Sequence, residues 1–402
     1  MSGLPKNWKL TDLEGIAAPV KNAIVDGPFG SNLKISDYVD EGVPVLQGKN
    51  ITQDSFRWFD VRYISEKKAE ELKRSSVRVG DILIVKIGSI GYSAILDDLN
   101  GHDFAIIPAN LAKLTINKDI ADLRYVQRWL NSTEAKRYLV KNASKTAQPA
   151  LSLTKLKKLP VPLPPLGEQR RIAEVLDRAD ALRQKRRLAL QKLDTLLQSV
   201  FLDMFGDPVI NPRQWPVEKL GILCDVRDGT HHSPRYVPEG YPLLTSKNFS
   251  AGRIDMTAVN LISKADYDET NRRSKVHRGD IIMPMIGTIG SPVLVDIDPE
   301  FAIKNVALIK FGKKSPSNTY IHRLLSSHYF DRVLSRNNRG GTQKFVALRD
   351  IRDFPIPCPP EDLQSRFEEV ANGIANTSHN LHVAALQTDA LFASIQTSAF
   401  RQ

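Results

Sequence analysis

Cysteine is nearly absent from this chain of 402 residues, which contains only Cys224 and Cys358. Two cysteines so far apart in the sequence cannot build the disulfide framework of a small secreted domain. They also lack the paired spacing of a structural zinc site. We therefore expect a protein of a reducing, intracellular compartment.

Long hydrophobic runs are also missing. Apolar stretches such as 82–85 have the length of a strand, whereas a membrane-spanning helix needs about 20 apolar residues. The first ten residues include Pro5, Lys6 and Trp8 and have no apolar core of the kind found in secretion signals. The sequence thus predicts a cytoplasmic protein.

Glycine-rich loops that would cradle a nucleotide are not recognisable either. The segment 42–50 has the wrong glycine spacing for a phosphate loop, and Asn50 follows Lys49 where a hydroxyl group is needed for magnesium. The segment 88–91, Gly-Ser-Ile-Gly, lacks the third glycine of a dinucleotide-binding fingerprint. A tight turn between strands is the better interpretation of this segment.

Catalytic motifs are likewise absent. No Gly-x-Ser-x-Gly nucleophile motif occurs, and 211–213 (Asn-Pro-Arg) departs from the Asn/Asp-Pro-Pro-aromatic loop of adenine methyltransferases. His379 and His382 have no carboxylate at a useful spacing, so we interpret them as solvated helix residues. The pair His231-His232 permits a metal site or a polar loop, and we prefer the polar loop. The sequence predicts a non-catalytic chain without a metal or a cofactor of its own.

The chain does have an excess of positive charge. It contains 56 Lys and Arg residues against 45 Asp and Glu residues, for a formal net charge of +11. Such a balance indicates an anionic partner, with nucleic acid as the first candidate. Residues 168–206 carry +2 and residues 361–402 carry −3, so the remainder carries +12. The positive charge is therefore concentrated outside these two segments.

The sequence also repeats itself. Gln169 and Gln364, 195 residues apart, each follow a proline-rich joint, at 159–165 and 354–360. Further matching segments are Gln47–Ile51 with Thr245–Phe249, Val79–Leu83 with Arg278–Ile282, Ile87–Gly91 with Ile286–Gly290, and Phe104–Ile106 with Phe301–Ile303. Two related halves in one chain suit a long ligand that is recognised at two places.

Each half has a mixed α/β part followed by a long helical part. Short β-rich runs such as 82–85 alternate with helical stretches near 123–140 and 320–334. The predicted boundaries are 1–165 for the first globular domain, 166–206 for a central helix, 207–360 for the second globular domain and 361–402 for a C-terminal helix. The expected fold class is an α/β (α+β) tandem repeat, with two globular domains separated by two long helices.

The two helices are predicted to pair as an antiparallel coiled coil with pseudo-two-fold symmetry, because each has an apolar stripe that must be buried. In the first helix, one seam position comprises Ile172, Ala179, Leu193 and Val200, interrupted by Arg186, and the other comprises Val175, Leu182, Ala189 and Leu196. The apolar stripe is widened by Leu176, Leu190, Leu197 and Met204. In the second helix, the seams comprise Phe367, Ile374, Leu381 and Ile395, and Val370, Ala384 and Leu391. The alternative is that each helix packs on its own globular domain.

One known family combines these features. The segment 164–172 (Pro-Pro-Leu-Gly-Glu-Gln-Arg-Arg-Ile) and the heptads after it closely resemble the central region of type I restriction-modification specificity (S) subunits. The segments 26–31 (Asp-Gly-Pro-Phe-Gly-Ser), 47–51 and 146–151 are similar as well, and the resemblance covers the whole chain. The second half departs from the pattern, because it has Gly-Thr-His-His-Ser-Pro at 229–234 in place of Gly-Pro-Phe-Gly-Ser.

The resemblance implies a non-catalytic subunit with two target-recognition domains. Each would read one half of a bipartite, asymmetric double-stranded DNA target, and the helical pair would set the gap between the halves. Two modification subunits would dock on the helices and use S-adenosylmethionine to methylate adenine N6, and restriction subunits that use ATP and Mg would join them. Two alternatives stay open: an S-like subunit of an orphan methylation or other phage-defence system, and a coiled-coil scaffold for protein interactions.

Candidate DNA-contacting residues are polar side chains in loops flanked by glycine, where the backbone can approach a duplex. They are Ser31, Lys49, Asn50, Ser89, Lys145, Gln148, Lys247, Asn248, Thr288, Arg339 and Gln343. The two lysines beside the two asparagines suit phosphate, and Asn50 and Asn248 suit the N6 and N7 atoms of adenine. The alternative is that these side chains only cap turns.

A basic cluster on the first helix comprises Arg183, Lys185, Arg186 and Arg187. It could contact phosphate, form a docking patch for a modification subunit, or be a solvated face. The position of Arg186 on the predicted seam indicates that at least one of the four has a partner within the chain.

The helix length predicts the spacing of the DNA target. A helix of about 38 residues is about 57 Å long, which spans at most about one and a half turns of B-DNA. We expect two half-sites on the same side of the duplex, about one turn apart. Inserting four residues into the first helix is expected to lengthen the spacer between them.

Overall fold

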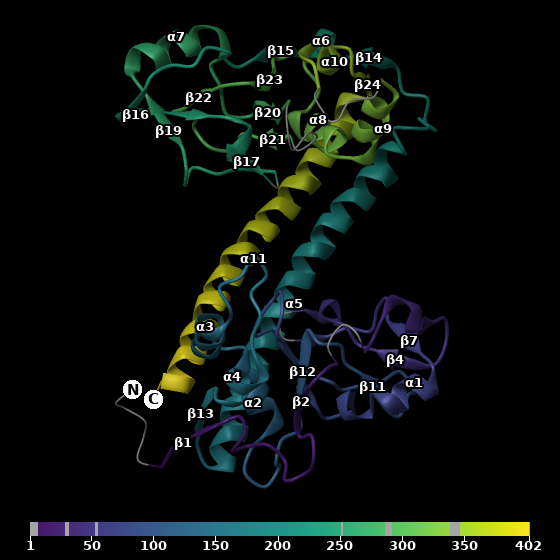
Figure 1. Ribbon diagram of the computed structural model, residues 1–402. Coiled ribbons are helices and arrows are strands. Elements are labelled where there is room, and N and C mark those ends of the chain that lie inside the picture. Colours follow the sequence, from purple (N-terminus) through teal and green to yellow (C-terminus); the bar gives the residue numbers. More distant parts are fainter. Residues whose placement is uncertain are drawn as a thin grey trace. The chain divides into compact units, whose positions relative to one another are not determined.

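The computed structural model describes residues 7–28, 32–52, 55–250, 252–285, 292–337 and 346–401 (Figure 1). The chain forms two compact units. Unit 1 comprises Met1–Arg187 and Val383–Gln402, and unit 2 comprises Leu188–His382. Each unit therefore contains a part of both long helices.

Unit 1 is an α/β assembly. Its described strands are β1 (Lys9–Asp12), β2 (Ile24–Asp26), β3 (Tyr38–Val39), β4 (Val43–Val45), β5 (Ile51–Thr52), β6 (Ser55–Phe56), β7 (Arg62–Ile64), β8 (Ser76–Val77), β9 (Ile82–Val85), β10 (Ser93–Ile95), β11 (Ala105–Ile106), β12 (Leu111–Leu114) and β13 (Pro160–Leu163). Its helices are α1 (Glu66–Glu71), α2 (Leu123–Leu130), α3 (Thr133–Asn142), α4 (Leu153–Lys157) and the first part of α5 (Leu166–Phe205). A four-stranded sheet has the order β10-β9-β12-β2, and a five-stranded sheet has the order β3-β7-β4-β11-β8.

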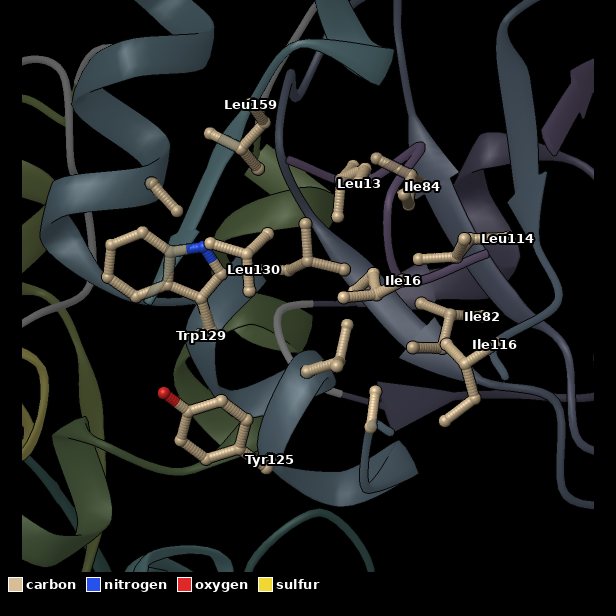
Figure 2. Close-up of a cluster of buried hydrophobic side chains, with 14 of the residues drawn as sticks. Leu13, Ile16, Ile82, Ile84, Leu114, Ile116, Tyr125, Trp129, Leu130 and Leu159 are labelled. Atoms are coloured by element: carbon tan, nitrogen blue, oxygen red, sulfur yellow. The ribbon is translucent and has the colours of Figure 1, made fainter. Parts of the chain in front are cut away.

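The strand β9 is apolar at every position because both of its faces are buried. Ile82 and Ile84 lie in one hydrophobic cluster with Tyr125 of α2 (Figure 2). Leu83 and Val85 lie in a second cluster on the opposite face. Since successive side chains of a strand point to opposite faces, a strand covered on both sides needs a continuous apolar run.

Unit 2 repeats this topology. Its described strands are β14 (Val217–Lys219), β15 (Asp225–Asp228), β16 (Tyr236–Leu244), β17 (Phe249–Ser250), β18 (Arg253–Ile254), β19 (Asn260–Ile262), β20 (Ile281–Pro284), β21 (Val293–Leu294), β22 (Ala302–Ile303), β23 (Val306–Lys310) and β24 (Pro355–Pro357). Its helices are α6 (Leu220–Leu223), α7 (Lys264–Ser274), α8 (Asn318–Leu325), α9 (His328–Asn337), α10 (Leu348–Arg352) and the first part of α11 (Glu361–Arg401). The four-stranded sheet β15-β23-β20-β21 corresponds to β2-β12-β9-β10 of unit 1.

The proline joints and the glutamines after them make equivalent contacts in the two units. Gln169 is fully buried, and its Oε1 accepts a hydrogen bond from the Asp122 amide, while its Nε2 donates to the Pro164 carbonyl. Gln364 accepts from the Ser317 amide and donates to the Pro359 carbonyl in the same way. Each glutamine therefore ties the start of a long helix to the globular part before it.

The two long helices pack against each other in antiparallel orientation. In unit 1, Arg183 of α5 contacts Asp389 of α11, and Arg186, further along α5, contacts the carbonyl of Ala384, which lies earlier in α11. The end of α11 also completes the core of unit 1, where the Phe400 ring lies 5.6 Å from that of Tyr125.

The end of α5 does the same in unit 2. The ring centroid of Phe205 lies 4.8 Å from that of Tyr320, and Phe205 also packs on Phe367 near the start of α11. Phe205 and Phe400 are equivalent residues of the two repeats, as are Tyr320 and Tyr125. The predicted fold class is confirmed: an α/β tandem repeat with two long helices paired as an antiparallel coiled coil. The alternative in which each helix packs only on its own globular part is wrong.

The predicted second seam of the helices is wrong by one residue. In both helices the residues of the first seam are buried or half-buried as expected, but Val175, Leu182, Leu196, Val370 and Leu391 are exposed. The observed second seam comprises Leu176, Arg183, Leu190, Leu197 and Met204 in α5, and Ala371, Ser378, Ala385, Phe392 and Ala399 in α11. Along each helix, the step from the first seam to the second is therefore four residues and the step back is three. The sequence predicts three residues and then four.

The helices α5 and α11 occupy 166–205 and 361–401. The boundaries of the four predicted segments stay a prediction, since the compact units divide the chain within the helices. In the described ranges, no helix has both the length and the apolar character needed to cross a membrane.

Candidate nucleic-acid interface

The candidate loops of unit 1 gather at one edge of its four-stranded sheet. The strand β2 ends at Asp26, opposite Ala112, and β9 ends at Val85, opposite Leu111, where β12 begins. The chain therefore leaves β2 and β9, and enters β12, on the same side. The next residue, Lys86, donates its amide hydrogen to the Asn110 carbonyl and accepts one from the Leu151 amide. Segments far apart in the sequence thus meet at Lys86.

The Lys86 side chain holds this edge together. Its Nζ lies 2.5 Å from Oδ2 of Asp26, and the two side chains are 6% and 10% exposed. Arg74 approaches the other carboxylate oxygen at 3.7 Å. A buried lysine and a buried aspartate each need a partner of opposite charge, because an unpaired buried charge is costly. The pair connects the end of β2 to the end of β9.

Two of the predicted DNA-contacting residues line one hollow at this edge. The hollow has a volume of about 500 Å³, and its lining includes Lys49, Thr52, Ile87, Ser89, Tyr92 and Asn110. Lys49 forms an ion pair with Asp60, and this hydrogen bond holds the pKa of the Asp60 carboxyl below its usual range. Ser89 is exposed in the turn after β9. The structure thus brings together a cation and a hydroxyl group that the sequence places 40 residues apart.

Lys145 and Gln148 belong to a loop that reaches the same edge. Ala150 forms a β-bridge with Ile87, and the Thr146 hydroxyl donates to the Gln148 carbonyl. The Lys145 and Gln148 side chains are exposed. Four predicted residues of unit 1 are therefore held on segments that meet at the end of β9.

Asn50 and Asn248 do not fit the predicted contact with adenine. Asn50 is fully buried, and its Nδ2 donates to the carbonyls of Arg57 and Phe59. Asn248 has the same environment, with Nδ2 donating to the Asp255 and Ala258 carbonyls. In both repeats Oδ1 accepts a backbone amide three residues earlier. These side chains close a loop and have no donor left for a base edge, so we remove them from the DNA-facing set.

Unit 2 has an equivalent sheet edge. Asp228 at the end of β15 is opposite Ala307, Pro284 at the end of β20 is opposite Val306, and the Val346 amide donates to the carbonyl of Met285. Lys247 is exposed in the turn before β17. The predicted residues Ser31, Thr288, Arg339 and Gln343 lie outside the described residues.

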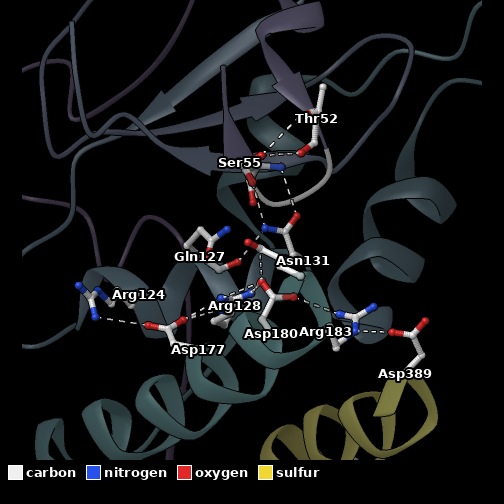
Figure 3. A network of polar contacts seen from close by, with 12 residues as sticks. Thr52, Ser55, Arg124, Gln127, Arg128, Asn131, Asp177, Asp180, Arg183 and Asp389 are labelled. Carbon is white, nitrogen blue, oxygen red and sulfur yellow. Dashed lines mark hydrogen bonds and ion pairs between the residues drawn. The ribbon is translucent and has the colours of Figure 1, made fainter. Parts of the chain in front are cut away.

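Three of the four residues in the basic cluster of α5 have partners within the chain, and Figure 3 shows those of Arg183. Arg183 bonds Asp180 and Asp389 and lies over the ring of Phe392, at 4.3 Å from its centroid. Arg183 holds the pKa of the Asp389 carboxyl below its ordinary value.

The other members of the cluster differ in exposure. Arg186 donates to the Ala384 carbonyl, and Arg187 pairs with Asp389 at 3.4 Å. The predicted role of Arg183 and Arg186 in phosphate contact or subunit docking is therefore corrected, because both are used in pairing the helices. Lys185 is exposed.

Sequence reasoning missed the residues that organise the edge. Asp26 and Lys86 were not among the candidates, nor were Thr52 and Tyr92 of the hollow. One signal was present: Lys86 is a charged residue directly after four apolar ones and directly before a glycine-containing turn. In the described ranges, no group of three or more His, Cys, Asp or Glu side chains is placed to hold a metal ion.

Each of the two α/β repeats has exposed polar and cationic side chains beside one sheet edge and is followed by a long paired helix. Residues 6–192 match the family described as the type I restriction modification DNA specificity domain.

Relatives similar to the chain over most of its length are specificity subunits. The putative type I restriction enzyme MjaX specificity subunit of Methanocaldococcus jannaschii is 23% identical over 382 residues, which cover 90% of this chain and 85% of the relative. The MjaVIII specificity subunit of the same organism is 25% identical over 395 residues, covering 92% and 90%. The Escherichia coli EcoBI specificity subunit is 26% identical over 228 residues, covering 55% and 45%.

Solved structures show the same fold. The S subunit of a type I restriction-modification system from M. genitalium has a TM-score of 0.60 at 14% identity, covering 100% of this chain and 98% of that one. A chain from a structure of a type I R-M system has a TM-score of 0.58 at 18% identity, covering 100% and 99%. The chain is thus similar to type I restriction-modification specificity subunits, in sequence over residues 6–192 and in fold over its whole length.

Proposed function

We propose that this chain is a non-catalytic DNA-reading subunit whose two repeats each recognise one half of a bipartite, asymmetric target. The paired helices set the number of unspecified bases between the halves. The chain holds no cofactor of its own and acts in the cytoplasm. S-adenosylmethionine is bound by modification subunits, and ATP and Mg are bound by restriction subunits.

One observation carries this proposal. In each unit, equivalent backbone hydrogen bonds join two segments at the same sheet edge, from the Leu151 amide to the Lys86 carbonyl and from the Val346 amide to the Met285 carbonyl. The loops differ in sequence between the repeats while the edge is built in the same way. Two similar frames with different loops are what recognition of two different half-sites requires, because side chains in the grooves carry sequence information.

The exposed apolar residues of the long helices support docking of modification subunits. Nine such residues are more than a third exposed: Val175, Leu182, Leu188, Leu196, Leu202, Val370, Val383, Leu386 and Leu391. Exposed leucines at helical spacing are unfavourable in water and mark a surface that a partner covers. We place Lys185 with this surface rather than with the DNA-contacting set.

The salt dependence of binding tests the proposal. We expect the affinity of the full chain for duplex DNA to fall steeply with rising salt, because lysines that contact phosphate release counterions from the duplex. Replacing Lys49, Lys145 and Lys247 together by alanine should make the slope of log affinity against log salt shallower by about three. Fluorescence anisotropy over a range of salt concentrations measures both slopes.

The control for this test is Lys185→Ala, an exposed lysine on α5. It should leave the slope unchanged, since it removes one positive charge from a different surface, whereas each single replacement in the triple variant should lower the slope by about one. If the triple variant kept the wild-type slope, the sheet edges would not be the DNA-contacting surface. The absence of DNA binding by the wild-type chain would favour the coiled-coil scaffold, which predicts protein binding that is insensitive to salt.

A further inference from the structure

The two repeats differ in how they neutralise one buried carboxylate. Asp26 and Asp228 are equivalent: each is the last residue of the first strand of the four-stranded sheet, opposite Ala112 and Ala307. In unit 1 the partner of Asp26 is Lys86. The equivalent residue of unit 2 is Met285, which carries no charge. The Asp228 side chain is still only 12% exposed, so it needs another partner.

His231 and Arg273 supply that partner. The Nε2 atom of His231 lies 2.8 Å from Oδ2 of Asp228, and Arg273 of α7 donates to Oδ1 at 2.7 Å. Arg273 corresponds to Arg74 of unit 1, which also approaches the carboxylate. The histidine therefore takes the place of Lys86 as the partner of the carboxylate. It lies in the loop 229–234, whereas Lys86 directly follows β9.

The second nitrogen of the histidine is also engaged. Its Nδ1 lies 2.9 Å from Oδ1 of Asn305. The equivalent oxygen of unit 1, on Asn110, is buried without a hydrogen-bond partner in the described structure. Both ring nitrogens of His231 thus face oxygen atoms that accept hydrogen bonds. Only the protonated ring, with two N–H groups, can donate to both of them.

The histidine fastens a loop that is otherwise held through its backbone and one serine. The Thr230 amide donates to the Ile303 carbonyl and the Asn305 amide donates to the Thr230 carbonyl, while Lys304 donates to the Ser233 hydroxyl at 2.6 Å. This loop stands where unit 1 has the Gly-Pro-Phe-Gly-Ser segment. Loss of the two ring contacts would leave its polar side chains less ordered at the sheet edge.

We propose that His231 is a positioning residue for the second repeat, whose protonated ring clamps the loop 229–234 to Asp228 and Asn305 and makes recognition of the second half-site depend on pH. Recognition of the first half-site has no such dependence, because its clamp is Lys86. This inference rests on the proposed function, since it assumes that each repeat reads one half of a DNA target.

The charges around the ring give the direction of the effect. The charged groups that face it are Asp228 from β15 and Arg273 from α7, and Lys304, beside Asn305, bonds Ser233. The hydrogen bond with Asn305, and then the one with Asp228, raises the pKa of His231 above its ordinary value of 6.5. Because the folded-state pKa is raised, the clamp is complete below about pH 6.5 and is lost as the pH rises through the raised value.

Binding of the full chain to three duplexes tests the inference. The duplexes contain the target found by mapping methylated adenines, with both halves intact, with only the first intact, or with only the second intact. Affinity is measured by anisotropy at constant ionic strength between pH 6 and pH 8.5. We expect the preference for an intact second half to weaken about two- to fivefold as the pH rises, a size typical of exposed ion pairs. The preference for the first half should stay constant.

Variants test whether His231 is the group that causes the pH dependence. His231→Gln should abolish the pH dependence, and His231→Gln with Met285→Lys should give tight, pH-independent recognition by rebuilding the lysine pair of unit 1. His232→Gln, the neighbouring histidine, should keep the wild-type profile. A second-half preference in the wild-type chain that is constant with pH would overturn the inference even if no variant folded. If neither half were preferred at any pH, the proposed function itself would fail.

Discussion

Lys86→Met is expected to lower the free energy of unfolding of unit 1 by about 3–5 kcal/mol, the cost of removing one partner of a buried ion pair. The value should lie near the lower figure, because Arg74 lies 3.7 Å from the Asp26 carboxylate and compensates in part. The substitution introduces the residue that unit 2 has at this position, Met285, but without the histidine that serves the carboxylate there. Urea unfolding, followed through tryptophan fluorescence in a Trp215→Phe background, measures the stability of unit 1. The three tryptophans that remain, Trp8, Trp58 and Trp129, all lie in that unit.

The matched control is the double variant Lys86→Met with Asp26→Asn. Removing both charges leaves no unpaired ion, so most of the lost stability should return. Hydrogen exchange should show faster exchange in β2, β9 and β12 of the single variant, and wild-type exchange in β15, β20 and β23. Equal loss of stability in the single and double variants would show that the charge pair does not hold the edge.

Lengthening both long helices by four residues is expected to move methylation to a target with a longer spacer. The insertions go between Arg187 and Leu188 in α5 and between His382 and Val383 in α11, where the two compact units divide. Each unit then keeps its own helix contacts. Four residues add about 6 Å to a helix, which is close to two base pairs at about 3.4 Å each. Methylation of the original target should disappear, and both half-sites should stay the same.

Two further variants control this experiment. Four residues inserted into α5 alone should act in the same direction with a loss of stability, since the helix pair is then mismatched. Four residues inserted at the exposed Lys313–Lys314 turn of unit 2 should leave the spacer unchanged. An unchanged spacer in the double insertion would mean that the helices do not determine it.

The fold was largely predictable because the repeat is encoded in residues that make local contacts. The proline joints can form only short edge strands, and the glutamine after each joint bonds the backbone beside it. The helix seam was less predictable. Both Val175 and Leu176 are apolar, so periodicity alone permits either as the second seam position. The choice depends on Arg183, whose guanidinium packs on Phe392, and a pattern of apolar residues does not count an arginine as part of the core.

The candidate site was predictable only in outline. Lys49 and Ser89 lie together because turns that follow neighbouring strands meet at one sheet edge. The polar loop around Asn50 predicts a contact with DNA, yet the Asn50 side chain bonds the backbone of that loop. The pairing of Asp26 with Lys86 joins residues 60 apart, and that of Asp228 with Arg273 joins residues 45 apart. Such contacts depend on the tertiary fold, and no local spacing indicates them.

Long-read sequencing of methylated adenines in a host that carries this chain with its modification subunits tests the account most directly. We expect one motif made of two different specified halves, separated by a constant number of unspecified bases. Exchanging the loops of one repeat should change one half and leave the other. Methylation at a single uninterrupted motif, or at two halves with a variable gap, would contradict it.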